Sequence, residues 1–221
     1  MRGLSRGQLA LHLTNPRDFA PGKHRSTDDT PFGGGSGMVM RPDPLVSALE
    51  AIEAQRGRGR RILLTPGGQP LRQSEVRRLA TLPHLTLICG RYEGFDERVR
   101  GFVDEELSLG DFVLTGGEVA AMAIVDACAR LLPGVLGNAD SSFHESHSPE
   151  MEGLLEYPQY TRPVEFRGER VPEILQNGNH AAIEAFRRAE SERRTRERRP
   201  DLWAAALAAR ASELDVPAGG D

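Results

Sequence analysis

Short apolar runs without polar alternation limit the fold of this chain more than any other feature of its sequence. Residues 62–65 (ILLT) and 85–89 (LTLIC) have the length of strands, and a segment with helical spacing separates them. A strand that is apolar on both sides must be covered on both faces, as in a parallel sheet flanked by helices. The sequence therefore predicts an α/β domain built on a parallel sheet.

Glycine-bearing loops follow three of the predicted strands, at residues 65–68 (TPGG), 90–94 (GRYEG) and 115–118 (TGGE). Ligands of open parallel sheets bind at the carboxyl ends of the strands. Glycine also allows the backbone to approach a ligand closely, since it has no side chain. We therefore expect these three loops to surround one ligand pocket.

The remaining segments predict elements around this sheet. Helices are expected near residues 43–56, 74–82 and 118–132, and residues 8–13 (QLALHL) have the pattern of a further strand. A polar and turn-rich segment follows at residues 14–37, which is unusually long for a loop without a function. Beyond residue 153 we expect a small helical region.

The composition of the 221 residues excludes several classes of protein. Hydrophobic residues make up 38% and charged residues 27%, and no apolar run has the length of a membrane span. The start of the chain lacks a signal-peptide core, and Cys89 and Cys128 lie outside any CxxC motif, which disfavours a zinc site or a disulfide framework. The expectation is a cytoplasmic protein without a membrane partner or a metal site. Its net charge of -4 argues against a uniformly basic nucleic-acid binder.

Several polar segments have both a structural and a functional interpretation. The loop at residues 33–37 (GGGSG) could bind phosphate, but it lacks the Walker pattern. His144 and His147 fit a solvated loop better than a metal cluster. Arg130 either serves the C-terminal dipole of its helix or points into a pocket, and the sequence leaves both open.

The segment at residues 187–199 is strongly basic, with seven arginines and three glutamates and hence a local net charge of +4. One interpretation is a solvated helix with ion pairs between residues three or four apart. The other is an electrostatic contact surface for nucleic-acid phosphates, which the excess of arginine modestly favours.

Together these segments resemble the bacterial tRNA (guanine-N1)-methyltransferase family, the trefoil-knotted SPOUT class. The resemblance is collinear and covers nearly the whole chain. It rests on residues 15–19 (NPRDF), 24–29 (HRSTDD), 31–38 (PFGGGSGM), 89–99 (CGRYEGFDERV), 108–118 (SLGDFVLTGGE), 132–137 (LPGVLG), 160–163 (YTRP) and 178–180 (GNH).

The resemblance implies a fold, an activity and partners. The fold would be an α/β parallel sheet covered by helices with a trefoil knot in residues 1–137, a flexible linker at 138–153 and a small helical tRNA-binding domain at 154–221. The activity would be methyl transfer from S-adenosyl-L-methionine to N1 of the guanosine immediately 3′ of the tRNA anticodon, position 37. The enzyme would be a homodimer whose subunits share the active site, and the need for Mg²⁺ stays open.

The resemblance also implies roles for individual residues. Arg130 would stabilise negative charge on guanine O6, and Glu145 stands where the family has its aspartate base, with Asp140 as the alternative if the alignment through the linker shifts. The tRNA would contact Asp28, Gly33, Gly34 and Gly35. The cofactor would contact Thr65, Pro66, Gly90, Tyr92, Glu93, Leu109, Gly110, Asp111, Phe112, Val113, Leu114, Gly116 and Gly117.

The chain departs from the family pattern at its start, because the family's first strand and most of its first helix have no counterpart before Met1. We therefore expect an N-terminally shortened version of the enzyme. Together with Glu145, this departure leaves a rival hypothesis, namely a non-catalytic RNA-binding protein of the same fold.

Overall fold

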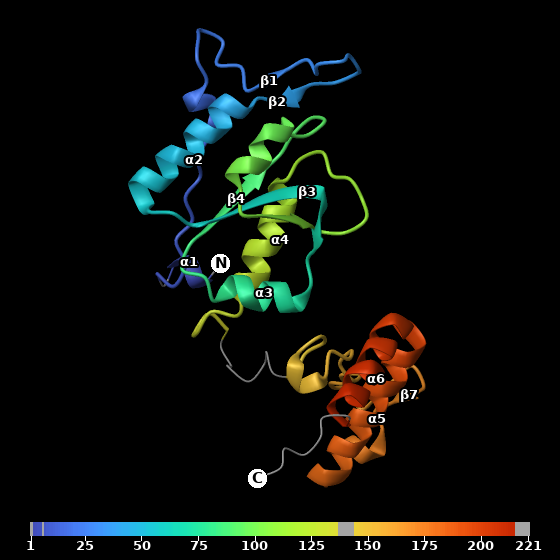
Figure 1. The fold of residues 1–221 in the computed structure, drawn as a ribbon. Helices are drawn as coiled ribbons and strands as arrows, with labels where there is room; N and C mark the ends of the chain where they lie inside the picture. Colours follow the sequence, from blue (N-terminus) through green and yellow to red (C-terminus); the bar gives the residue numbers. More distant parts are fainter. Residues whose placement is uncertain (1, 6, 137–143, 215–221) are drawn as a thin grey trace, which may run out of the picture. The chain divides into compact units, whose positions relative to one another are not determined.

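Three parallel strands in the order β4-β3-β5 form the central sheet. Figure 1 labels two of them, β3 and β4. This computed structural model describes residues 2–5, 7–136 and 144–214. The chain divides into two units, residues 1–137 and 138–221, and the sheet belongs to the first. Its strands are β3 (Arg60–Pro70), β4 (Leu85–Cys89) and β5 (Glu105–Ser108). The predicted α/β class with a parallel sheet is confirmed.

Helices cover both faces of the sheet, which explains why its strands have no polar alternation. On one face, Ile62 and Leu64 pack in a buried cluster with α3 (Gln73–Ala80) and α4 (Glu118–Ala129). On the other face, Leu63 and Ile88 form a second cluster with side chains of α2 (Pro42–Arg56) and the 3₁₀ helix η2 (Glu97–Phe102). Successive side chains of β3 thus point to opposite faces, and each face has an apolar partner.

Two short strands form an antiparallel hairpin before α2. β1 (Asp28–Asp29) pairs with β2 (Val39–Met40), so that the glycine-rich residues 33–37 lie in the loop between them. The segment before this hairpin holds α1 (Arg2–Ser5) and the 3₁₀ helix η1 (Pro16–Phe19).

Two expectations about strands were wrong. Residues 8–13 form no strand, and Leu13 is 90% exposed, because no neighbouring strand in the described part of the chain pairs with this segment. The glycine-bearing loop at residues 115–118 also has no strand directly before it: residues 112–114 are irregular, and the third strand of the sheet is β5, which lies earlier in the chain. The third loop is therefore longer than expected and includes residues 109–117.

The second unit is mainly helical, with the long helices α5 (His180–Arg198) and α6 (Pro200–Leu214). Helix α5 is fixed to the segment before it by two buried hydroxyl groups. Ser191 Oγ donates a hydrogen bond to the Leu155 carbonyl (2.6 Å), and Thr195 Oγ1 accepts one from the Leu155 amide (2.9 Å). The shorter elements are η4 (Pro149–Met151), β6 (Glu165–Phe166), β7 (Glu169–Arg170) and η5 (Glu173–Leu175).

None of the helices within the described ranges is long and apolar enough to cross a membrane.

Candidate functional site

A pocket of about 490 Å³ lies at the carboxyl ends of the three parallel strands. Its lining comes from the end of the regular part of β3, from the loop after β4 and from the loop after β5. The volume lies within the range of small-molecule sites, roughly 300–1,000 Å³. The pocket therefore occupies the position that the sequence predicted from its glycine-bearing loops.

The loops after β4 and β5 touch through their backbones. Arg91 and Gly116 form an antiparallel bridge, and the Gly117 amide donates a hydrogen bond to the Gly90 carbonyl (2.8 Å). A Cβ atom on Gly117 would lie 2.8 Å from Cα of Cys89, closer than folded proteins tolerate. Glycine is therefore required where these two loops meet.

The residues that the resemblance assigned to the cofactor come together in this pocket, although they are spread over more than fifty positions of the sequence. Asp111 is the exception, since it is exposed and is not part of the lining. The lining includes Thr65, Pro66, Gly90, Tyr92, Glu93, Leu109, Gly110, Phe112, Val113, Leu114, Gly116 and Gly117.

The lining also includes residues that the sequence analysis missed, among them Phe95, Glu97 and Arg100. They extend the wall that the loop after β4 begins. The Arg100 side chain pairs with Glu97 (2.8 Å) and Glu106, and these carboxylates raise its pKa above the usual value. These residues directly follow the glycine-bearing loop within residues 90–100 (GRYEGFDERVR), and this closeness in the sequence could have revealed them.

Charged groups of both signs surround the pocket. Arg91 Nε donates to the Glu118 carboxylate (2.8 Å), which closes the contact between the two loops. The Arg98 side chain donates to Asp96 and holds the pKa of that carboxyl below its usual value.

Burial, with a smaller effect from the Glu118 charge, raises the pKa of the Cys89 thiol, so this cysteine stays protonated near neutral pH.

The β1–β2 hairpin is fixed to the wall of the pocket. The Met40 amide donates to the Gly94 carbonyl, and the Asp96 amide donates to the Met40 carbonyl, both at 2.9 Å. The Glu93 amide donates to the Met38 carbonyl (3.0 Å), and a Cβ on Gly37 would collide with the Glu93 side chain. The hairpin that carries the expected tRNA contacts therefore lies against the loop after β4.

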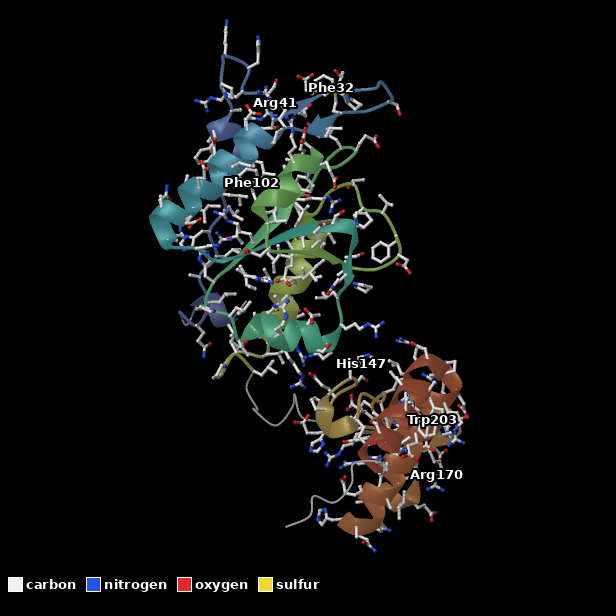
Figure 2. All side chains as sticks on the ribbon, in the orientation of Figure 1. Phe32, Arg41, Phe102, His147, Arg170 and Trp203 are labelled. Carbon is white, nitrogen blue, oxygen red and sulfur yellow. The ribbon has the colours of Figure 1, made fainter. Side chains whose placement is uncertain are left out.

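The expected tRNA contacts differ in burial. Asp28 is half-buried in β1, whereas Gly33, Gly34 and Gly35 are exposed in the hairpin loop with positive φ angles of 87°, 81° and 128°. Phe32, on the same loop, has a fully exposed side chain (Figure 2). The loop thus presents backbone and one aromatic ring to the surroundings.

The two expected catalytic residues lie in different units. Arg130 is the half-buried C-cap of α4, where its amide donates to the Asp126 carbonyl (3.2 Å), and it is not part of the pocket lining. Glu145 belongs to the second unit, and its carbonyl accepts a hydrogen bond from the Ser148 amide (3.1 Å). Asp140 lies outside the described residues. Across the described ranges, no three potential metal ligands gather at one place.

The fold and the pocket define a class: an α/β protein with a ligand site at the carboxyl ends of a parallel sheet. The family model described as tRNA (Guanine-1)-methyltransferase TrmD matches residues 1–205. The chain therefore belongs to the tRNA (guanine-1)-methyltransferase family.

Individual relatives agree with this assignment. A protein of Sorangium cellulosum named tRNA (guanine-N(1)-)-methyltransferase is 61% identical, and the match covers 91% of this chain and 84% of the relative. A protein of the same name from Anaeromyxobacter sp. is 56% identical over 97% of this chain and 86% of the relative. One from Myxococcus xanthus is 56% identical over 94% and 83%.

Proposed function

We propose that this protein methylates N1 of a guanosine in tRNA, with S-adenosyl-L-methionine as methyl donor. Membership of the family supports the reaction, and the backbone-walled pocket is the observation that carries it. We further propose that the target is the guanosine immediately 3′ of the anticodon, and that the reaction takes place in the cytoplasm.

The pocket fits S-adenosyl-L-methionine in its volume and in its mixture of groups. Leu64, Leu107 and Ala120 offer apolar surface for an adenine ring, while the loops offer backbone amides and carbonyls for polar atoms. The charged side chains of Arg91 and Glu93 suit the charged amino-acid part of the donor. When bound, the donor supplies an electrophilic methyl group on a positively charged sulfur.

The reaction requires two tasks of the chain's own side chains. The N1–C bond forms as the S–C bond of the donor breaks, and the N1 proton must leave because neutral guanine holds it near pH 7. We assign the removal of the N1 proton to Glu145, which would act as general base. We assign to Arg130 the stabilisation of the negative charge that spreads to guanine O6 as the proton leaves.

We also propose the family's assembly, a knotted homodimer whose subunits share each active site. Exposed apolar side chains support an interface on α4 and the loop before it. Val113 is 82% exposed, Val119 58% and Met122 70%, and Val119 and Met122 lie three residues apart on one side of the helix. A face of this kind on a soluble protein is typical of a contact with another protein surface.

In this proposal the parts of the chain divide the work. Residues 1–137 hold the donor in the knotted domain, residues 138–153 form the linker that carries Glu145, and residues 154–221 bind tRNA. The segment at 187–199 supports the last assignment by its excess of arginine.

The experiment that tests the proposal combines donor binding with catalysis. Calorimetry should give saturable heat when S-adenosyl-L-methionine is added, and incubation with unmodified tRNA transcript should yield 1-methylguanosine. Parallel reactions with EDTA and with added Mg²⁺ determine whether the ion assists. Binding of tRNA without donor binding and without methylation would instead support the non-catalytic RNA-binding alternative.

A further inference from the structure

The wall of the pocket is closed where the loops after β4 and β5 meet, and we call this contact between residues 90–91 and 116–118 the seam. Two of its contacts join backbone groups of the two loops. A third joins side chains, because Arg91 Nε donates to the Glu118 carboxylate at 2.8 Å. The seam therefore has a component that a substitution can remove without changing the backbone.

Glu118 reaches the seam from the start of α4. It is the first residue of this helix and lies outside the pocket lining, whereas Arg91 is part of the lining. The Glu118 carboxylate covers Gly116: a Cβ atom on this glycine would collide with the carboxylate and would lie 3.2 Å from Arg91 Nε. Negative charge is favourable at the N-terminus of a helix, so α4 itself stabilises the carboxylate there. Glu118 thus lies behind the wall and acts on a bound ligand through Arg91.

The ion pair restricts two loops that are rich in glycine. Glycine loses more conformational freedom on ordering than any other residue, so such loops gain much entropy when they open. A bond between side chains across the seam reduces the number of open conformations. It also orients Arg91, because the bond uses Nε and leaves the terminal nitrogens of the guanidinium able to donate to a carboxylate in the pocket.

We propose that Glu118 is a positioning residue for the methyl donor: through its ion pair with Arg91 it keeps the seam closed and slows the departure of S-adenosyl-L-methionine from the pocket. This inference rests on the proposed function and adds to it a residue outside the pocket lining. The two side chains are 57% and 48% exposed, so solvent screens the ion pair and its effect is modest. A modest effect suits a donor that must leave the pocket as product after each turnover.

The test removes this carboxylate and, in a matched control, a second one. Glu118→Gln keeps the size of the side chain but ends the ion pair. Asp43→Asn is the control, because Asp43 also lies in the first turn of its helix and pairs with an arginine, Arg41, at 2.6 Å. Its side chain is 48% exposed, as is that of Glu118, and it does not line the pocket.

The dissociation of S-adenosyl-L-methionine from the full chain is measured by surface plasmon resonance, and the affinity by calorimetry. We expect Glu118→Gln to release the donor roughly twofold to fivefold faster and to bind it more weakly by the same factor. The single-turnover methylation rate at saturating donor should stay unchanged, because Glu118 does not contact the reacting atoms. Asp43→Asn should release the donor at the rate of the original chain.

A double-mutant cycle tests whether Glu118 acts through Arg91. In an Arg91→Gln background, Glu118→Gln should have no further effect on dissociation, because its partner is absent. An undiminished effect in that background would overturn the proposal. So would an unchanged dissociation rate in Glu118→Gln, or an equal increase in Asp43→Asn. If thermal melting shows that Glu118→Gln does not fold, Glu118→Ser takes its place, since serine is well tolerated at helix starts.

The role of Glu118 and the proposed function fail in different ways. If Glu118→Gln releases the donor faster but the original chain methylates no tRNA, the proposed function fails and the role of Glu118 stands. If the original chain methylates tRNA and all variants release the donor at the same rate, only the role of Glu118 fails. A folded chain that does not bind S-adenosyl-L-methionine would contradict both.

Discussion

Arg130, at the end of α4, is the residue to which we assign charge stabilisation, and its substitution tests that role. We expect Arg130→Ala to lower the methylation rate at least about a hundredfold, because charge on guanine O6 would lose its partner. The affinity for S-adenosyl-L-methionine, measured by calorimetry, should stay unchanged, since Arg130 does not line the pocket. Nearly normal turnover would instead identify Arg130 as a residue that only serves the helix dipole.

Glu145 is the expected base, and its test uses a side chain of nearly the same size. Glu145→Gln cannot accept the N1 proton, so single-turnover methylation should fall by roughly two to four orders of magnitude. Glu145→Asp should keep the activity, because the carboxylate remains. If Glu145→Gln methylates normally and Asp140→Asn does not, the base is Asp140.

Two adjacent glycines of β3 provide a matched pair. A Cβ on Gly68 would lie 2.6 Å from backbone atoms of Leu107, whereas a Cβ on Gly67 would meet nothing within 4 Å. Gly68→Ala should lower the free energy of unfolding by about 1–3 kcal/mol through overpacking. It should also weaken donor binding, because Leu107 lines the pocket. Gly67→Ala should change stability by less than about 0.5 kcal/mol. Equal effects of the two substitutions in chemical denaturation would contradict this packing.

At the scale of elements, one carboxylate connects the turn after η4 to both long helices. Glu152 accepts from Arg188 on α5 (2.6 Å) and from Arg210 on α6 (2.7 Å), and these bonds hold its pKa below the usual value. A lowered pKa stabilises the fold above the pKa of the unfolded chain, and this contribution disappears as the pH falls through the folded pKa.

Glu152→Gln should therefore destabilise the second unit near pH 7 and have little effect below about pH 4. Because the Glu152 side chain is 40% exposed, solvent screening limits the loss to about 1 kcal/mol. Thermal melting is followed by Trp203 fluorescence, since this ring lies 5.5 Å from the Arg210 guanidinium. Glu169→Gln, on the exposed strand β7, is the control. A difference that persists at acidic pH would contradict the ion-pair account.

The sequence predicted elements well where local pattern and tertiary contacts agree. Residues 85–89 are a strand with the expected bounds, because an apolar run and a parallel neighbour favour the same structure. β3 continues to Pro70 although Pro66–Gly68 is a local turn signal, because Gln69 and Pro70 still pair with β5. Residues 8–13 show the reverse case, since strand-like residues form no strand without a partner.

The site, too, could be predicted where the local sequence decides the structure, and not where contacts between distant segments decide it. Its glycine-bearing loops were recognisable because a pocket at strand ends requires a close approach of backbones. Phe95 and Arg100 were missed, because their contribution depends on how η2 packs beside the sheet. The engagement of the α5 arginines also depends on contacts that sequence spacing only partly predicts, such as Arg188 with Glu152.

At the scale of the whole molecule, the proposed homodimer predicts that α4 carries the interface. Met122→Glu places a charge on the exposed apolar face and should convert the dimer into monomers in analytical ultracentrifugation. Methylation should fall with it, because each active site would lack its partner. Leu207→Glu, on the exposed surface of α6, should leave the dimer intact. A monomeric original chain that methylates tRNA would exclude the shared site.

The central claim is methylation of one atom of one nucleoside, and product mapping tests it most directly. Unmodified tRNA transcript is incubated with the protein and S-adenosyl-L-methionine, digested, and analysed by mass spectrometry of fragments and nucleosides. The account predicts 1-methylguanosine immediately 3′ of the anticodon, and none in a transcript with adenosine at that position. Methylation of another atom or another position, or no methylation by a folded protein that binds the donor, would contradict it.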